Sequence, residues 1–369
     1  MKNVLICISG LHMDNGIAQV IMNYYESLIK NGYNIDFLEM VEGYTDEKYA
    51  EIISKNGGKI YVVPKHNKYS RRSVVSKYVS KLLFEENYDI VHVNLVNLYA
   101  FLCIKIAKKN GVKNIIYHIH NPKHFTKTML LNNIFNNYCI NNASQLVACS
   151  SSAGKSVFGR RNFKIINNTI DVKKYIFSYE VREKYRKDMG IDNKLVIGVV
   201  ARKENQKNPF FIIDIFKYIS ERNKNVVLLW IGTGSLDKKV EDYAKKKKVY
   251  DKVKFLGLRK DVKKLYSCMD VFLLPSKFEG LGIVFIEAQS FGLPTYTSTN
   301  VPEDVNISDL IHFINLKEKP EKWGKAILDT KIEQQKRCEY NELVCTTAFN
   351  KENNNALVEL YDEILNGEK

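Results

Sequence analysis

The order of the apolar segments constrains the fold of this chain more than any other feature. Short runs rich in β-branched residues alternate with longer stretches of helical periodicity. The strands expected in the first part are Val4–Ile8, Ile35–Leu38, Lys59–Val63, Ile90–Val93, Asn114–His118, Gln145–Cys149 and Lys164–Asn167. Helical segments between them include Ala18–Lys30, Tyr69–Asn87, Leu98–Asn110 and Met129–Asn141. This alternation predicts an α/β fold with a parallel, doubly wound sheet, whose ligands bind beyond the carboxyl ends of the strands.

The alternation stops once and then restarts. A charged stretch without strands runs from Asp171 to about Asn193 and is expected to connect two domains. The strands expected beyond it are Leu195–Val200, Val226–Ile231, Val253–Leu256, Val271–Leu274 and Thr295–Ser298. Two domains also agree with a length of 369 residues, which exceeds one ordinary core. Periodicity then predicts an amphipathic helix over Glu352–Asn366, with an apolar stripe of Leu357, Leu360, Tyr361, Ile364 and Leu365.

Composition and charge limit the class of protein and its partners. The chain is 45% hydrophobic and 26% charged, as in folded globular proteins. Its start, Val4–Ile8, is too short an apolar run for a signal peptide, and no run approaches the ~18 residues of a membrane span. Of the seven irregularly spaced cysteines, Cys7, Cys103, Cys149 and Cys268 are expected at core positions of a cytosolic protein, not as disulfides or zinc ligands. The net charge of +15 favours nucleotides, anionic lipid or nucleic acid, but no recognised nucleic-acid module is present, so no nucleic-acid partner is expected.

One loop carries the pattern most specific for function. After the apolar strand Val271–Leu274 comes Pro275-Ser276-Lys277-Phe278-Glu279-Gly280-Leu281-Gly282-Ile283, and then an apolar helix that contains Glu287. Backbone N–H groups at the start of such a helix can hold an anion or sugar oxygens. A glutamate on each side of the glycines can accept hydrogen bonds from hydroxyl groups. Recognition of phosphate and hydroxyls on one loop indicates a nucleotide-sugar.

This loop resembles the Glu-x7-Glu signature of retaining glycosyltransferases of the GT-B type, sequence family 4 (glycosyl transferases group 1), and especially bacterial capsule and exopolysaccharide enzymes. Leu281 stands where the family usually has an aromatic residue. The chain's segment Gly16–Asn23 is similar to the family's Gly-Ile-x-x-Val-x-Met-Asn start. The resemblance implies two Rossmann-like domains facing a central cleft, with the last helix crossing back to the first domain. Residues 1–172 with 350–369 would then bind the acceptor, and residues 173–349 the donor.

The resemblance also assigns roles to residues of the second domain. Glu279 would contact the hydroxyls of the donor sugar and Glu287 the ribose, with Gly280–Ile283 close to the donor. Arg202 and Lys207, which follow an apolar strand, match an Arg-x4-Lys pair that stabilises the departing diphosphate, as forked and compact cations can. The backbone of Leu258 and Arg259 corresponds to a segment that contacts the nucleobase. The glycine turn Ile231–Gly234 either faces the same ligand or is purely structural.

No Asp-x-Asp sequence is present, although metal-dependent glycosyltransferases of the single-domain type use one to hold a divalent ion. Cationic side chains and a helix dipole would then neutralise the leaving group. The resemblance accordingly implies no metal at the centre and no cofactor, with the nucleotide-diphosphate sugar as co-substrate.

Two groups of residues in the first domain are also candidates. Gly16, preceded by Asn15, opens the first helix, and free N–H groups there can bind a phosphate or the acceptor. His118 and His120 lie on one side of a strand end. A metal site is one interpretation of this pair, although no third ligand is evident. In the resembled family a histidine at this point hydrogen-bonds the donor sugar; the pattern favours His120, with His118 as the alternative.

The segment Lys65–Lys81 is strongly basic. It contains Lys65, Lys68, Arg71, Arg72, Lys77 and Lys81, no acidic residue, and a row of apolar positions. A basic amphipathic helix of this kind can lie on an anionic membrane surface, and it can equally be an ordinary surface helix of a lysine-rich protein.

The sequence thus predicts a metal-independent hexosyltransferase (EC 2.4) in surface polysaccharide biosynthesis. It would move a sugar from a nucleotide-diphosphate donor, with UDP expected, to a glycan or a polyprenyl-diphosphate-linked acceptor, and it would be cytoplasmic or peripheral on the inner face of the membrane. The alternatives are an epimerase or phosphorylase that uses the same fold, and a non-catalytic polyanion-binding protein driven by charge. The sugar, the linkage and the oligomeric state are not determined by the sequence.

Overall fold

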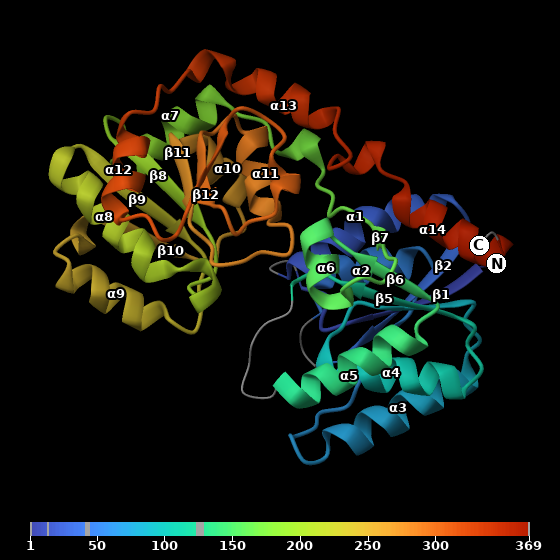
Figure 1. Ribbon diagram of the computed structural model, residues 1–369. Coiled ribbons are helices and arrows are strands. Elements are labelled where there is room, and N and C mark those ends of the chain that lie inside the picture. The colour runs from blue at the N-terminus through green and yellow to red at the C-terminus, as the bar shows by residue number, and fades with distance from the viewer. Residues whose placement is uncertain (1, 13–14, 41–44, 123–128, 368–369) are drawn as a thin grey trace. The chain divides into compact units, whose positions relative to one another are not determined.

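The computed structural model describes residues 2–12, 15–40, 45–122 and 129–367 of the chain. The chain folds into two compact units, one made of Met1–Ile170 with Asn354–Lys369 and the other of Asp171–Asn353 (Figure 1). Each unit is built on its own all-parallel sheet covered by helices, which confirms the predicted α/β class with two Rossmann-like domains.

The sheet of the first unit has seven strands in the order β3-β2-β1-β4-β5-β6-β7. The strands are β1 Lys2–Ile8, β2 Tyr33–Glu39, β3 Ile60–Val62, β4 Ile90–Val93, β5 Asn114–Ile119, β6 Gln145–Ala148 and β7 Lys164–Ile165. The helices are α1 Gly16–Lys30, α2 Glu47–Lys55, α3 Arg71–Glu85, α4 Asn97–Lys109, α5 Met129–Asn142 and α6 Ser151–Phe158. All seven predicted strands are present, and the central strands, such as β1 and β4, have the nearly continuous apolar sequences of strands that are buried on both faces. The strand order reverses between β1 and β4, where ligands of such sheets bind.

The last helix, α14 (Ala356–Asn366), belongs to the first unit although the second unit precedes it in sequence. It packs beside α1, and Leu357, Leu360 and Tyr361 of the predicted stripe are buried, whereas Ile364 and Leu365 are only partly covered. Asp362 forms an ion pair with Lys2 and accepts a hydrogen bond from the Tyr33 hydroxyl at 2.7 Å. The predicted return of the last helix to the first domain is confirmed.

The sheet of the second unit has six strands in the order β10-β9-β8-β11-β12-β13. The strands are β8 Leu195–Val200, β9 Val226–Ile231, β10 Val253–Gly257, β11 Val271–Leu274, β12 Thr295–Ser298 and β13 Ile311–Ile314. The main helices are α7 Tyr179–Asp188, α8 Pro209–Arg222, α9 Asp237–Lys246, α10 Val262–Cys268, α11 Ile283–Ser290, α12 Pro320–Leu328 and α13 Arg337–Cys345. β13 was not predicted, because this short edge strand is only partly buried and exposes His312. The order reverses between β8 and β11, so the loops that follow these two strands leave the sheet side by side.

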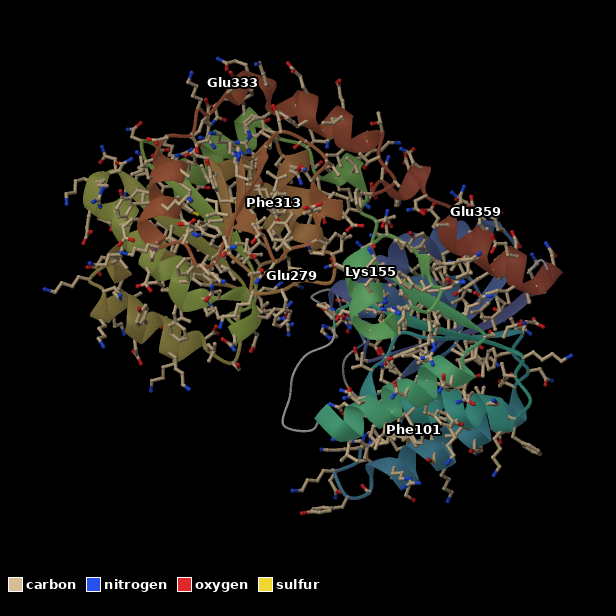
Figure 2. The ribbon with its side chains drawn as sticks, in the orientation of Figure 1. Phe101, Lys155, Glu279, Phe313, Glu333 and Glu359 are labelled. Atoms are coloured by element: carbon tan, nitrogen blue, oxygen red, sulfur yellow. The ribbon has the colours of Figure 1, made fainter. Side chains whose placement is uncertain are left out.

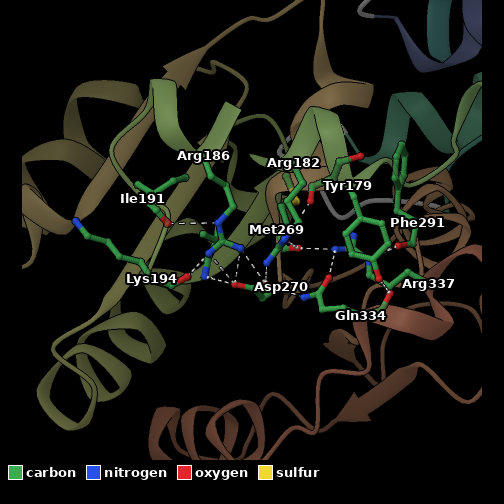
Figure 3. Close-up of polar contacts among 12 residues, drawn as sticks. Tyr179, Arg182, Arg186, Ile191, Lys194, Met269, Asp270, Phe291, Gln334 and Arg337 are labelled. Atoms are coloured by element: carbon green, nitrogen blue, oxygen red, sulfur yellow. Dashed lines mark hydrogen bonds and ion pairs between the residues drawn. The ribbon is translucent and has the colours of Figure 1, made fainter. Parts of the chain in front are cut away.

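The charged stretch that was predicted to connect the domains begins at the boundary between the two units, but much of it forms α7, which packs on α10 of the second unit. The buried carboxylate of Asp270 explains this (Figure 3). It accepts hydrogen bonds from Arg182 and Arg186 of α7 and from the Val196 N–H of β8. The guanidinium of Arg337 in α13 donates to the carbonyls of Phe291 and Met269 at 2.8 and 3.0 Å. These two residues cap the C-terminal ends of α11 and α10, so both helix ends and β8 are fixed around one ionic cluster.

Candidate functional site

Glu279 lies in the turn between β11 and α11, at the point where the strand order reverses (Figure 2). Its side chain is 5% exposed. The Lys207 ammonium group lies 2.6 Å from Glu279 Oε1, and the Ser276 hydroxyl donates to the same oxygen at 2.6 Å. Gln206 donates to Oε2 at 3.2 Å. Lys207 and Gln206 come from the loop after β8, so the fold brings the two predicted loops together on one carboxylate.

The glycine that precedes α11 is required by its surroundings. Gly282 has φ +88°, in the left-handed region that other residues rarely adopt, and it is the N-cap of the helix. A Cβ there would lie 2.6 Å from the Phe285 ring and 3.4 Å from Glu279 Cγ. Leu281 is buried and Gly280 is covered, whereas Ile283 in the first turn is partly exposed. The first turn therefore starts next to Glu279. Phe285 N–H donates to Gly282 O at 3.0 Å, whereas the N–H groups that precede it at the start of a helix have no acceptor within the helix.

The three cations after β8 have different environments. Arg202 is exposed, whereas Lys203 is 2% exposed and donates to Gly232 O and Asp237 Oδ1, both at 3.0 Å. A Cβ on Gly232 would lie 2.4 Å from Ala201 O, so the turn after β9 packs directly on this loop. Lys203 and the glycine turn Ile231–Gly234 thus pack on each other, while Arg202 is exposed and Lys207 pairs with the Glu279 carboxylate.

Glu287 is buried inside the second unit, on α11. The hydroxyl of Tyr266 donates to its Oε2 and that of Tyr175 to its Oε1, each at 2.8 Å. Burial raises the pKa of Glu287, and the two hydrogen bonds and the charge of Lys263 oppose this rise. The two glutamates of the signature therefore differ in setting: Glu279 is paired with a lysine, and Glu287 is held by two tyrosines.

The segment expected near the nucleobase follows β10, at the same edge of the sheet as the loops after β8 and β11. Gly257 ends the strand with φ +65°, and its carbonyl accepts a hydrogen bond from Gly232 N–H at 2.8 Å. Leu258 is 61% exposed, and Arg259 pairs with Asp261 at 2.8 Å. The side chain of Arg259 is thus exposed and paired within its own turn, and the predicted contact of this segment with a nucleobase stays a prediction.

In the first unit, the loop after β1 is ordered by Asn15. Its side chain accepts from Ile17 N–H at 3.1 Å, capping α1, and donates to Gly10 O at 2.8 Å. A Cβ on Gly16 would meet no atom within 4 Å, so a small residue is not required here by the surrounding protein. Met13 and Asp14 of this loop lie outside the described residues.

His118 and His120 are buried at the end of β5. Nε2 of His120 hydrogen-bonds Asn94 Oδ1 at 2.8 Å, and Nδ1 of His118 hydrogen-bonds Nε2 of His92 in β4 at 3.1 Å. Burial lowers the pKa of His120 to about 4, although Asn168 partly offsets this, and burial also lowers the pKa of His118. Both imidazoles are therefore neutral near pH 7. Within residues 2–12, 15–40, 45–122 and 129–367, no three His, Cys, Asp or Glu side chains are grouped to hold a metal ion.

The helix predicted over Tyr69–Asn87 is α3, which starts two residues later and ends two residues earlier than expected and overlaps the basic segment Lys65–Lys81. Val75, Val79, Leu82 and Leu83 bury one side of it. Its exposed side carries Arg72, Lys77 and Lys81, and two aromatic side chains at its ends, Tyr69 and Phe84, are 84% and 86% exposed. None of the helices in the described part of the chain is long and apolar enough to cross a bilayer.

Sequence reasoning missed three polar partners of these groups: Tyr175, Tyr266 and His92. Tyr175 lies 112 residues from Glu287 and Tyr266 lies 21 residues away, and neither is part of a recognisable motif. His92 lies within an apolar strand pattern, where the expected interpretation is a core residue. Alternation along β4 and β5 was the signal that could have placed His92 on the same side as His118.

Comparisons with known proteins agree with this architecture. The family model "Glycosyltransferase Family 4" matches residues 14–174, and "Glycosyl transferases group 1" matches residues 181–342. The chain is 28% identical over 339 residues to the putative glycosyltransferase EpsF of Bacillus subtilis, covering 88% of this chain and 87% of that protein. It is 28% identical over 244 residues to an Escherichia coli UDP-Gal:α-D-GlcNAc-diphosphoundecaprenol α-1,3-galactosyltransferase, covering 62% and 61%.

The crystal structure of Anabaena HepE in complex with UDP and glucose has the same fold. Its TM-score with this chain is 0.79 at 16% identity, covering 98% of this chain and all of the other. The two family models together span both units of the fold. The chain therefore belongs to the glycosyltransferases of family 4 and group 1, with the GT-B fold, whose relatives act in polysaccharide biosynthesis.

Proposed function

We propose that this glycosyltransferase is a retaining enzyme that transfers a hexose from a UDP-sugar to a glycan or lipid-linked acceptor during surface polysaccharide biosynthesis. The observation that carries the proposal is the pairing of Lys207 with Glu279 beside the start of α11. This arrangement places a cation, a hydroxyl-binding carboxylate and a helix N-terminus at the carboxyl ends of adjacent strands, β8 and β11. The similar Escherichia coli protein is named for UDP-Gal and a diphosphoundecaprenol acceptor, and the Anabaena structure contains UDP, which supports the choice of donor and acceptor class.

In this proposal the donor diphosphate lies at the first turn of α11, where the helix dipole favours negative charge. Arg202 and Lys207 stabilise the charge that develops on the leaving diphosphate, an effect realised mainly in the transition state. Lys207 is positioned by its ion pair with Glu279, and when the donor binds it would exchange this carboxylate contact for a contact with a phosphate oxygen. These cations would do the work that a divalent metal ion does elsewhere.

Glu279 has the contacts expected of a residue that orients a sugar. Ser276, Gln206 and Lys207 fix its carboxylate in one position, and an ionised carboxylate has further lone pairs that can accept from sugar hydroxyls. Glu287 would bind the ribose in the same way through the lone pairs that Tyr175 and Tyr266 leave free. The tyrosine contacts make Glu287 a rigid acceptor for a ligand hydroxyl.

The proposal includes docking of the first unit on an anionic membrane through α3. Exposed aromatic side chains at both ends of a basic helical face, Tyr69 and Phe84, are the observation that favours it over an ordinary surface helix. Aromatic side chains favour the membrane interface, and basic side chains add attraction to anionic lipid. Such docking would place the enzyme beside a polyprenyl-diphosphate-linked acceptor.

The experiment that tests the function has two stages. Thermal unfolding is first measured with UDP-, GDP-, ADP- and dTDP-sugars, because a ligand that binds only the folded state raises the melting temperature. The stabilising donor is then supplied with candidate lipid-linked acceptors, and the anomeric configuration of the product is determined by NMR. Selective stabilisation by UDP-sugars and a product with the donor's configuration are expected. An inverted product, or free UDP and sugar formed without any acceptor, would contradict the proposal.

A further inference from the structure

Three buried side chains form a hydrogen-bonded row from the C-terminal helix to the end of β5. The hydroxyl of Tyr361 in α14 lies 2.7 Å from Nδ1 of His92, and Nε2 of His92 lies 3.1 Å from Nδ1 of His118. The His92 and His118 rings are nearly parallel, at an angle of 9°, with centroids 5.3 Å apart. All three side chains are at most 1% exposed. The row links the last helix of the chain to the strand end where His120 lies.

The chemistry of the row fixes the direction of its hydrogen bonds. Burial raises the pKa of Tyr361 well above its ordinary value, so the hydroxyl keeps its proton. The hydroxyl has His92 Nδ1 as its partner among the described residues, and a buried O–H needs an acceptor. Nδ1 of His92 therefore accepts. Burial also lowers the pKa of His92 to about 3, so the neutral ring carries its single proton on Nε2.

The tautomer of His92 in turn determines which ring nitrogen of His118 carries the proton. His92 Nε2–H donates to His118 Nδ1, which must then be the unprotonated nitrogen of a neutral ring. His118 accordingly carries its proton on Nε2. That nitrogen is buried and has no hydrogen-bond partner within the described residues. A buried donor without an acceptor is costly and is rare in folded proteins, unless a ligand or water completes it.

A second buried donor without a partner lies on Asn94, which binds the neighbouring His120. The centroids of the His118 and His120 rings lie 4.1 Å apart, and Nδ2 of Asn94, whose Oδ1 binds His120 Nε2, has no partner in the described structure. Asn168 hydrogen-bonds His120 and is therefore already engaged. Two uncharged donors, His118 Nε2–H and Asn94 Nδ2–H, suit a ligand oxygen that accepts hydrogen bonds, as the oxygens of a sugar do.

We propose that Tyr361 and His92 are positioning residues for sugar transfer: they hold His118 as the Nε2–H tautomer, so that it donates a hydrogen bond to an oxygen of the bound sugar. Tyr361 and His92 act only through His118 and do not touch the substrate. The inference rests on the proposed function for the identity of the ligand, but the tautomer itself follows from the row of hydrogen bonds alone.

The first test measures the tautomer directly. NMR of the full chain labelled with [15N]histidine distinguishes a protonated from an unprotonated ring nitrogen. We expect His118 to be protonated on Nε2 in the wild-type protein, and Tyr361→Phe to produce a mixture of tautomers in His92 and His118. Tyr33→Phe is the matched control, because Tyr33 packs edge-on against Tyr361 and binds Asp362 of the same helix but is not part of the row. An unchanged His118 tautomer in Tyr361→Phe would overturn the inference.

The second test is a double-mutant cycle on kcat/KM for transfer. His118→Asn retains an acceptor for His92 and removes the Nε2–H donor, so we expect a loss of about three- to tenfold, the scale of one hydrogen bond. Tyr361→Phe should lose a similar factor, and the double variant should lose no more than the larger single loss. Losses that multiply, or an equal loss in Tyr33→Phe, would contradict the proposal. If the wild-type protein transfers no sugar at all, the proposed function fails, while the NMR result still decides the role of Tyr361.

Discussion

Acid should unfold the first unit before the second, because the first unit buries three neutral histidines. Burial lowers the pKa of His92 to about 3 and that of His120 to about 4, and it also lowers the pKa of His118. In the unfolded chain these groups titrate near pH 6.5. Between that pH and their folded pKa values the unfolded state binds more protons, so the free energy of unfolding decreases as the pH falls.

The size of this effect follows from linkage. Each histidine removes up to about 1.4 kcal/mol per pH unit below pH 6.5, which amounts to roughly 2 kcal/mol for each group at pH 5. His92 and His120 together account for about 4 kcal/mol, a large part of the stability of an ordinary domain, and the lowered pKa of His118 acts in the same direction. The first unit should therefore lose much of its stability between pH 6.5 and pH 5.

Two optical probes separate the units. The chain has two tryptophans, Trp230 and Trp323, and both are buried in the second unit. Far-ultraviolet circular dichroism reports on both units, whereas tryptophan fluorescence reports on the second. In urea titrations at pH 5 we expect a circular dichroism transition that precedes the fluorescence transition, and the gap between them should narrow at pH 7.

A substitution makes the test specific. His92→Gln should reduce the pH dependence of the first transition by about 1.4 kcal/mol per pH unit below pH 6, one group's share. His66→Gln, which changes a partly exposed histidine of the same unit, is the matched control. Coincident transitions at pH 5, or an unchanged pH dependence in His92→Gln, would show that protonation of the buried histidines does not unfold the first unit.

Three further predictions concern the proposed chemistry. Glu279→Gln should lower turnover more than Glu287→Gln does. Glu287→Gln should mainly raise the dissociation constant of the donor, because a ribose contact is largely uniform binding. Kinetics with varied donor concentration check this, and the reverse order would mean that the two roles are exchanged. Activity should persist near its untreated level in excess EDTA, and complete loss that manganese or magnesium restores would contradict the cationic mechanism. Replacing the exposed cations Lys68, Arg72 and Lys77 by Gln should release the protein from anionic vesicles, since each contributes about 1 kcal/mol of membrane binding. The matched control replaces Lys238, Lys239 and Lys246 of α9 and should leave binding unchanged. Equal co-sedimentation of the two variants with vesicles would show that α3 is not the anchor.

The fold was predictable from the sequence for those segments whose residues are determined by burial alone. Strands such as β1 and β8 are buried on both faces, so their sequences are continuously apolar and easily recognised. β13 escaped prediction because an edge strand is half exposed and mixes His312 with apolar residues. α7 escaped because it is held by the contact of Arg186 with Asp270, 84 residues away, and not by an apolar stripe.

The candidate site was predictable as a set of loops but not as a set of contacts. The glycine pattern and the spacing of the two cations placed Lys207 and Glu279 after strands that prove to be neighbours. Sequence alone could not show that Lys203, next to Arg202, is buried on Asp237, or that two tyrosines hold Glu287. These partners depend on how loops from separate strands meet, which no local pattern encodes.

Calorimetric titration of UDP into the wild-type protein, Lys207→Ala and Lys277→Ala tests whether Lys207 and Glu279 mark the site of the donor diphosphate. Lys277 lies in the same loop as Glu279, is exposed and binds Asn205, so its substitution removes an equal charge without touching the Lys207–Glu279 pair. We predict that the wild type binds UDP and that Lys207→Ala weakens binding by about ten- to a hundredfold, the scale of a hydrogen bond to a charged group. Lys277→Ala should change binding by less than about fivefold, as expected for an exposed charge. Equal affinity of Lys207→Ala and the wild type for UDP would contradict the assignment of this loop pair as the site of the donor diphosphate.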